Sequence, residues 1–309
     1  MISPTDKSYE AEVSSWWAKN ARQKADCFVL PHTSDEVAMA LKTLVQADCE
    51  GGSDIAVRSG GHSSTGSSST VNGVTIDLSR LNSTSYNRQA NTVSVGPGGR
   101  WQYVYAELIQ YGVTATGGRD GDVGVGGFLL GGGNSYYSGR MGFGCDSVVN
   151  FEVVLGNGTI INANQTTNAD LWRALKGGSN NFGIVTRFDM EAVPAPKLFR
   201  DTRFLLSNYS DAFVDAVVGF ADSDESIVDD HFFTFFSHDP RSVPGLDIFA
   251  AGVHVNTQGN TNSPTPFDEV VALPAFFNNT TVETIADAAA GSQVQSGTWY
   301  VDDHQIDPL

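Results

Sequence analysis

Two glycine-rich segments constrain the fold of this chain more than any other feature. The first is Arg58-Ser59-Gly60-Gly61-His62-Ser63, which follows Asp54-Ile55-Ala56-Val57, a run typical of a buried strand. The chain therefore leaves a strand and turns through two glycines with unpaired backbone amides, and such amides form concave anion sites. The second segment spans Gly117 to Gly133, where repeated glycines let the backbone approach a large ligand closely. Together the two loops predict a cofactor that contains a diphosphate.

A Rossmann dinucleotide-binding unit is the main alternative for these glycines. It needs a strand, Gly-x-Gly-x-x-Gly, a helix and then an acidic residue about 20 positions later. Gly124-Val125-Gly126-Gly127 lacks that spacing, and the Asn134-Ser135-Tyr136-Tyr137 that follows is a poor helix. We therefore reject the Rossmann interpretation.

Three further motifs follow in order along the chain: Gly144 to Val148, Asp170 to Gly178 and Asn180 to Thr186. With these motifs, the two glycine loops resemble the FAD-binding module of the vanillyl-alcohol oxidase/p-cresol methylhydroxylase superfamily. The closest branch is the berberine-bridge-enzyme-like FAD-linked oxidoreductases. The matching motifs extend over roughly residues 25 to 195 in the family's order.

This resemblance implies an α+β fold in two parts. Residues 1–195 are expected to form a two-part FAD-binding domain, and residues 196–309 a partial substrate domain with an antiparallel sheet backed by helices. Pro194 and Pro196 mark the boundary. In the family, a longer substrate domain is followed by a C-terminal segment with an Asn-Tyr motif, and this sequence stops at Leu309, before any such segment. We therefore expect this chain to bind FAD but to catalyse poorly.

Local patterns predict individual elements. A cap at Thr33 or Ser34 begins a helix with an apolar stripe. Glycines between two apolar runs predict a hairpin over residues 151–161, and Asn168 is expected to cap a helix over 169–176. Aromatic residues between Tyr9 and Trp17 indicate an N-terminal helix. The second part is expected to contain strands at 203–206, 231–236 and 248–255 and a helix at 211–220.

His62 occupies the position at which the family bonds a histidine covalently to a methyl carbon of the flavin's benzenoid ring. A histidine held by loop carbonyls is the alternative. Members with a second covalent bond carry a cysteine where this chain has Asp120, so a single link through His62 is expected. Val123 takes the family position that governs dioxygen access, although valine is also a common core residue. The residues expected to contact FAD are Arg58, Ser59, Gly60, Gly61, His62, Ser63, Gly117, Gly118, Asp120, Val123, Gly124, Gly126, Gly127, Gly183, Ile184 and Val185.

The resemblance implies an oxidase that moves a hydride from an alcohol- or amine-bearing carbon of a small molecule to flavin N5, with dioxygen as reoxidant. The alternative is a truncated, inactive flavin-binding remnant or a secreted glycoprotein fragment. The catalytic acid or base is unassigned, because the available candidates lie in no matching motif. These candidates are His231, His238, His254, Tyr136 and Tyr137.

Composition excludes several classes of partner. A net charge of −17 and a pI near 4.5 argue against nucleic acid and anionic membrane surfaces, both of which require basic patches. The sequence contains no run of 18 apolar residues, so no membrane-spanning helix is predicted. The histidines are scattered and no cysteine pair has ligand spacing, so no metal site is expected.

Six Asn-x-Ser/Thr sequons favour a secretory origin, although such sequons also arise by chance; they begin at Asn82, Asn157, Asn164, Asn208, Asn278 and Asn279. The N-terminus lacks the features of a signal peptide. In the resembling family, cysteines near Cys27 and Cys49 are commonly joined, and secretion would permit that bond. Two small buried thiols are the alternative. Cys145 is expected to be buried and inert.

Overall fold

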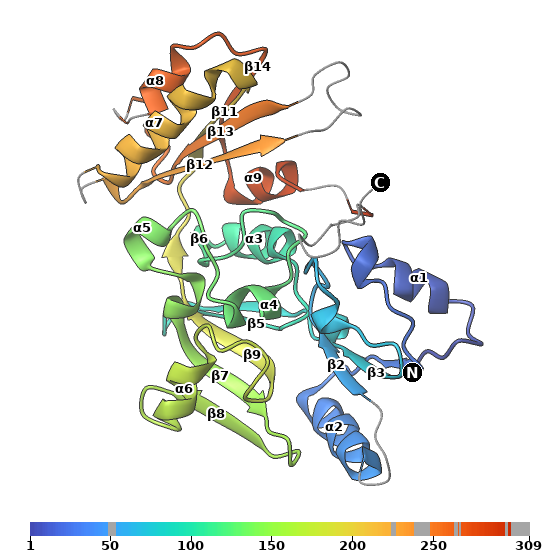
Figure 1. Cartoon of the computed structure of the whole chain (residues 1–309). Helices are drawn as coiled ribbons and strands as arrows, with labels where there is room; N and C mark the ends of the chain where they lie inside the picture. Colours follow the sequence, from blue (N-terminus) through green and yellow to red (C-terminus); the bar gives the residue numbers. More distant parts are fainter. Residues whose placement is uncertain are drawn as a thin grey trace, which may run out of the picture.

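The computed structural model describes residues 1–48, 54–223, 227–237, 248–262, 265, 267–293 and 296–297. It has an α+β fold, as predicted, with helices packed between and against separate sheets (Figure 1). Elements up to residue 194 form the lower part of the view in Figure 1, and those from residue 198 form a four-stranded sheet with its helices at the top. No described helix is both long and apolar enough to cross a membrane.

The first sheet carries the Arg58-to-Ser63 loop at one end. Its order is β1–β3–β2, with all strands parallel: β1 is Cys27–Val29, β3 is Gly73–Asp77 and β2 is Asp54–Arg58. Helix α2 (Ser34–Asp48) connects β1 toward β2, and Glu36 N–H donates to Thr33 Oγ1, so Thr33 is the cap. Buried Val37 and Leu41 of α2 pack in one cluster with Ile76 and Leu78.

The first part also contains a second sheet, of five antiparallel strands. Its order is β4–β5–β9–β7–β8, comprising Thr84–Asn87, Thr92–Val95, Ile184–Glu191, Val148–Val154 and Ile160–Asn164. The predicted hairpin is confirmed, because β7 pairs with β8 through a turn in which Gly158 has φ +80°. Helices α3 (Trp101–Ile109), α4 (Val125–Leu130), α5 (Ser138–Met141) and α6 (Ala169–Leu175) belong to this part, as does the short pair β6 (Val113–Thr114) and β10 (Val193–Pro194).

The four-stranded antiparallel sheet has the order β12–β13–β11–β14, comprising Asp230–Ser237, Phe249–Asn256, Leu198–Leu206 and Phe277–Glu283. Helices α7 (Ser210–Ala221) and α8 (Phe267–Val271) cover one face, with Phe213 and Phe267 in a cluster with Leu205 and Ala250. The opposite face packs on the first part, because Val253 and Val255 share a core cluster with Trp101. Helix α9 (Ile285–Gly291) then returns to pack on α3.

Several expectations about elements were wrong. The N-terminal helix α1 covers only Tyr9–Ser14, and Trp16 and Trp17 lie beyond it in the core. Asn168 precedes α6 with φ 50°, and its side chain donates to Asn162 O instead of capping the helix. Neither β14 nor α9 was expected, because the Asn- and Thr-rich β14 and the Ala-rich α9 lack the alternation or stripe that marks an element.

A buried ionic network fastens α1 to the first sheet. Arg58 Nη1 lies 2.9 Å from Glu12 Oε1 and 3.1 Å from Asp77 Oδ2, and the guanidinium stacks 3.7 Å from the centre of the Trp16 ring. Arg58 also donates to Ser15. Burial, followed by the Asp77 carboxylate, raises the pKa of Glu12. The Arg58 cation therefore offsets the repulsion between the neighbouring Glu12 and Asp77 carboxylates.

We predict that Arg58→Ala lowers the free energy of unfolding by about 3–5 kcal/mol, because it removes the ion-pair partner of buried Asp77 and half-buried Glu12. Urea denaturation measures the change. Lys24→Ala is the control, since the Lys24–Glu10 pair is exposed and its loss leaves the unfolding midpoint unchanged. Equal midpoints for the Arg58→Ala variant and the unmodified chain would contradict the prediction.

Candidate functional site

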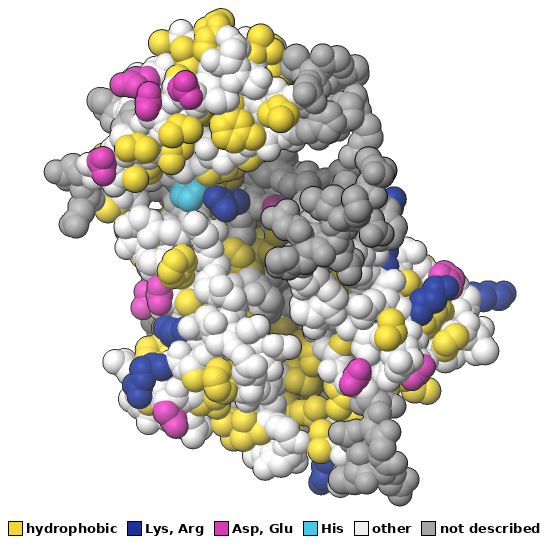
Figure 2. Space-filling view, viewed as in Figure 1, with side chains coloured by type: hydrophobic (Ala, Val, Ile, Leu, Met, Phe, Trp, Pro, Cys, Tyr) yellow, Lys and Arg dark blue, Asp and Glu magenta, His cyan; other side chains and the backbone are white. Residues whose placement is uncertain are grey.

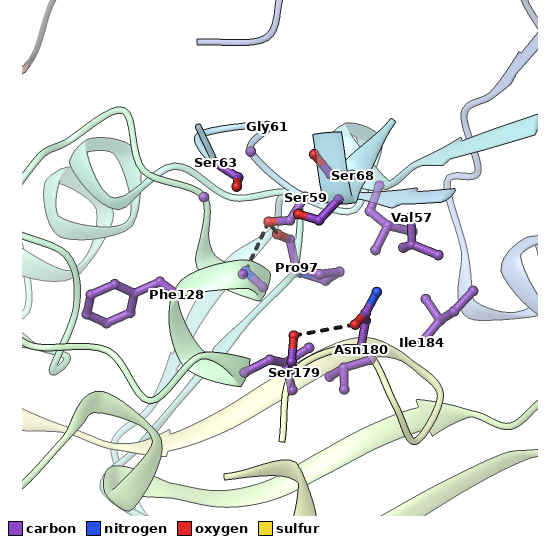
Figure 3. Close-up of a pocket in the computed structure, with 18 of the residues that line it drawn as sticks. Val57, Ser59, Gly61, Ser63, Ser68, Pro97, Phe128, Ser179, Asn180 and Ile184 are labelled. Carbon is purple, nitrogen blue, oxygen red and sulfur yellow. Dashed lines mark hydrogen bonds between the residues drawn. The ribbon is translucent and has the colours of Figure 1, made fainter. Parts of the chain in front are cut away.

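A cavity of about 730 Å³ lies between the two sheets of the first part (Figure 3). Three segments supply most of its wall: the loop after β2, the start of α4 with the residues before it, and the turn that leads into β9. Hydroxyl groups, bare backbone and aliphatic side chains alternate around it. The lining residues are Leu41, Ile55, Val57, Ser59, Gly60, Gly61, His62, Ser63, Ser67, Ser68, Leu78, Pro97, Val123, Gly124, Gly126, Gly127, Phe128, Leu130, Gly156, Ser179, Asn180, Asn181, Phe182, Gly183, Ile184 and Val185.

The two glycine loops touch at Gly60 and Gly124. A Cβ atom added to Gly60 would lie 2.6 Å from Gly124 Cα, and one added to Gly124 would lie 2.4 Å from Gly60 N. Ser59 locks the contact, because its hydroxyl donates to Pro97 O at 2.5 Å and accepts from Gly126 N–H at 3.0 Å (Figure 3). Glycine is therefore required at both positions by backbone packing.

His62 is held in the cavity wall by a stacked indole and faces a carboxylate. Its ring lies 4.6 Å from that of Trp17 at an interplanar angle of 11°, and Trp17 N–H donates to Gly61 O. His62 Nε2 is 3.6 Å from Asp120 Oδ2, too far for a hydrogen bond. That nitrogen is buried without a hydrogen-bond partner among the described residues. It is thus a polar group at the cavity edge with capacity to react or bind.

The space in front of α4 is open. A Cβ atom added to Gly127 would meet nothing within 4 Å, although this residue lines the cavity. The size of the cavity, the bare backbone at Gly127 and the orphaned His62 nitrogen fit a large, partly polar cofactor such as FAD.

Most, but not all, of the residues expected to contact FAD line this cavity. Arg58 does not, because its guanidinium is engaged with Glu12 and Asp77 on the other side of the loop. Gly117 and Gly118 are also outside the lining. Cβ atoms at these positions would lie 2.1 and 2.7 Å from Trp101, so glycine is required there to let the backbone pack on the indole. Asp120 is also outside the lining, and its carboxylate lies 3.6 Å from Nε2 of His62, which does line the cavity.

Sequence reasoning missed several lining residues, including Pro97, Phe128 and Asn180. Asn180 and Pro97 could have been found from the sequence. Asn180 belongs to one of the motifs that resemble the family, and Pro97 lies in the glycine-rich segment that ends a predicted strand. Leu41, Ile55 and Val57 form an apolar wall of the cavity that the sequence could not have indicated. Apolar residues of a helix or strand are expected in the hydrophobic core.

A second polar cluster lies where the four-stranded sheet faces the first part. Arg119 Nη1 is 2.9 Å from His231 Nε2, and the Tyr136 ring meets His231 edge-on at 5.6 Å. Burial, together with the Arg119 cation and His254, lowers the pKa of His231 to about 4, so the imidazole is neutral at pH 7. Its Nε2 therefore accepts the hydrogen bond from Arg119, since a guanidinium has no lone pair to offer.

The other acid–base candidates are placed differently. His254 is buried and bonds Asp230 at 2.7 Å on the helix-covered side of the sheet. Tyr137 is buried with an unpaired hydroxyl, and burial raises its pKa. His238 lies outside the described residues. Within those residues, no group of His, Cys, Asp and Glu could hold a metal ion.

Comparison with known proteins agrees with this geometry. The model of an FAD binding domain matches residues 25–164. An FAD-dependent monooxygenase of Aspergillus calidoustus is 47% identical over 195 residues, which are 63% of this chain and 37% of that protein. An uncharacterized FAD-linked oxidoreductase of Arthroderma benhamiae is 37% identical over 222 residues, which are 71% of this chain and 44% of that protein.

Solved structures share the fold at low sequence identity. The chain matches 6-hydroxy-D-nicotine oxidase of Arthrobacter nicotinovorans with a TM-score of 0.79 and 20% identity, over 94% of this chain and 62% of that one. It matches a variant of berberine bridge enzyme with a TM-score of 0.76 and 20% identity, over 94% and 59%.

The chain thus spans about two fifths of the length of these two curated relatives. Residues 25–164 match the FAD binding domain that these FAD-linked oxidoreductases share, and the fold of the chain is like that of berberine bridge enzyme.

Proposed function

We propose that the cavity holds FAD through one covalent bond to His62 and that the whole protein oxidises a small molecule with dioxygen. We further propose residues 1–195 as the FAD-binding domain and residues 196–309 as part of the substrate domain. When bound, FAD supplies an acceptor whose N5 takes a hydride from an alcohol- or amine-bearing carbon and whose electrons pass to dioxygen. The observation that carries the proposal is the His62 ring, which is stacked on Trp17 with Nε2 toward Asp120 and lines a cavity framed by interlocked glycine loops.

His62 and Asp120 form a pair suited to a covalent link. A carboxylate 3.6 Å from Nε2 favours a proton on that nitrogen, because it stabilises the N–H dipole. The lone pair then resides on the other ring nitrogen, which is the form that can act as a nucleophile. Stacking on Trp17 fixes the plane of the ring. A carboxylate at position 120 forms no thioether, which supports a single attachment.

Dioxygen as the second substrate is supported by the names of similar proteins, which include monooxygenases and an oxidase. Val123 lines the cavity next to the Gly124 contact, where its small branched side chain leaves room near the cofactor.

We predict that Gly127→Leu lowers the FAD content of the purified chain at least several-fold, because the new side chain enters open cavity space. Absorbance near 450 nm per polypeptide measures FAD, and circular dichroism checks the fold. Gly127→Ala is the matched control, since one methyl group occupies little of the cavity and glycine-to-alanine changes favour a helix. Full FAD content in Gly127→Leu would place the cofactor elsewhere.

We predict that flavin stays with the polypeptide after acid precipitation and that His62→Ala releases it. Trypsin cleaves after Arg58 and Arg80, so the flavin should map to peptide 59–80 alone. His32→Ala is the control. His32 is exposed, lies beside Glu36 and does not line the cavity, so this variant should keep the flavin attached. Flavin that washes out of the unmodified protein, or an adduct on a cysteine, would sink the single-link proposal.

We also propose that the protein enters the secretory pathway. Five of the six sequon asparagines are exposed and therefore open to modification; Asn164 is half-buried. Cys27 begins β1 at the same end of the sheet at which Asp54 begins β2, whereas Cys49 lies outside the described residues. The Cys27–Cys49 bond therefore stays a prediction. Cys145 is buried, and burial raises the pKa of its thiol, so it is unreactive in the native protein.

We predict that reduction raises the intact mass of the secreted protein by two hydrogens. In denaturant, a thiol reagent should label only Cys145 when no reductant is present. After reduction it should label all three cysteines. Three labelled thiols without reductant would exclude the bond.

A further inference from the structure

The face of the four-stranded sheet that looks toward the first part has a polar end and an aromatic end. Strand alternation and register place His231 of β12, Arg200 of β11 and Val255 of β13 in one row across this face. Two residues along β12 comes Phe233, and two further comes Phe235. Figure 2 shows a hollow below this sheet, with a histidine and a basic side chain next to each other at its upper edge.

Arg119 reaches this face from the second glycine loop and has no carboxylate partner among the described residues. Its described contacts are His231, 2.9 Å from Nη1, and the face of Phe233, whose centre is 4.9 Å from Cζ. Burial lowers the pKa of Arg119, yet a guanidinium remains charged at pH 7. The nearest ring nitrogen belongs to a neutral imidazole, so the positive charge is not compensated there.

Six other arginines in the described chain have an acidic partner. On the same sheet, Arg200 pairs with Glu283 at 2.7 Å and Arg203 with Asp201 at 3.1 Å. The remaining four are Arg58, Arg100, Arg140 and Arg187. Arg80, Arg88 and Arg173 have no such pair among the described residues but are exposed to water, and half-buried Arg22 donates to Trp16 O and Ser296 Oγ. A partly buried cation without such a partner is costly unless an anion joins it.

Tyr136 adds an unused donor beside this cation. Its relative exposure is 3%, and its hydroxyl makes no hydrogen bond of normal geometry among the described residues, although the Ser292 side chain is close enough to lower its pKa. Burial raises the pKa of Tyr136, so the hydroxyl keeps its proton. Arg119 and Tyr136 thus present donors in the same region.

The aromatic end continues from this cluster. Phe233 and Phe235 stack at an interplanar angle of 18° with centres 6.5 Å apart, and Phe235 is 43% exposed. Phe204 and Phe277 share the last row with Phe235. An exposed row of aromatic faces favours a flat apolar ligand.

We propose that Arg119, with Tyr136 and His231, binds the ionised acidic group of a flat aromatic substrate whose ring lies along Phe233 and Phe235. The proposal rests on the proposed oxidation, since it names the substrate class for that site. Asp120, whose carboxylate faces His62, directly follows Arg119 in the chain, so the anion site and the proposed point of flavin attachment belong to the same loop. In this proposal the acid anchors the substrate between that loop and the four-stranded sheet.

Calorimetry with 2-naphthoate and 2-naphthamide tests the proposal on the full chain purified with its FAD, without turnover. We expect the carboxylate to bind about tenfold or more tightly than the amide, because charge-assisted hydrogen bonds exceed neutral ones. Arg119→Gln should bring the ratio close to one, and Arg119→Lys should keep part of it. Phe235→Ala should weaken both probes by a similar factor. Arg203→Gln is the control, because Arg203 points to the opposite face with Asp201 and should leave the ratio unchanged.

Equal affinities of the unmodified chain for the two probes, or no measurable binding of naphthoate at millimolar concentration, would overturn the proposal even if Arg119→Gln failed to fold. A preference that survives in folded Arg119→Gln would do the same. The FAD content of the same samples is measured separately. A naphthoate preference in protein that lacks flavin would therefore contradict the proposed cofactor site while leaving the anion site standing.

Discussion

The close contact between Gly60 and Gly124 is the constraint on which the functional part of this structure depends. It brings the end of a parallel sheet against the start of α4, and Ser59 fastens the two backbones with hydrogen bonds to Pro97 O and from Gly126 N–H. Any side chain at either glycine would separate the loops. Because His62 and Val123 are each within two residues of this contact, the same constraint positions both at the cavity.

Sequence reasoning located the fold and much of the cavity wall because their signals are local. The β-branched run before Ser59, the hairpin around Gly158 and three of the four strands of the last sheet depend on periodicity and turn chemistry that act over a few residues. The cavity residues drawn from glycine loops were found for the same reason. Arg58, Gly117 and Gly118 were assigned to the cofactor because they belong to the same motifs. The Arg58 side chain pairs instead with Glu12 and Asp77, and the backbone of Gly117 and Gly118 packs on Trp101. A motif states which residues occur together but not which way each side chain faces.

The relations that escaped sequence reasoning are long-range. Arg119 and His231 are 112 positions apart, and no periodicity connects a glycine loop with an edge strand. The two buried arginines beside the glycine loops illustrate the difference. Arg58 lies among carboxylates and serves stability, whereas Arg119 meets an imidazole, a phenol and a phenyl ring. Both read as loop arginines in the sequence, and only the fold distinguishes a structural cation from one that is available to a ligand.

The return of α9 to the first part affects how a ligand reaches the site. The chain passes between the two parts after β10 and again after β14, where Ile285, Ala288 and Ala289 enter the main core and Ala289 O accepts from Gly121 N–H at 2.9 Å. Two connections, one of them anchored beside the Asp120 loop, oppose rotation about a single hinge. A ligand would therefore reach the site through side-chain and loop rearrangements at its rim rather than through closure of one part on the other.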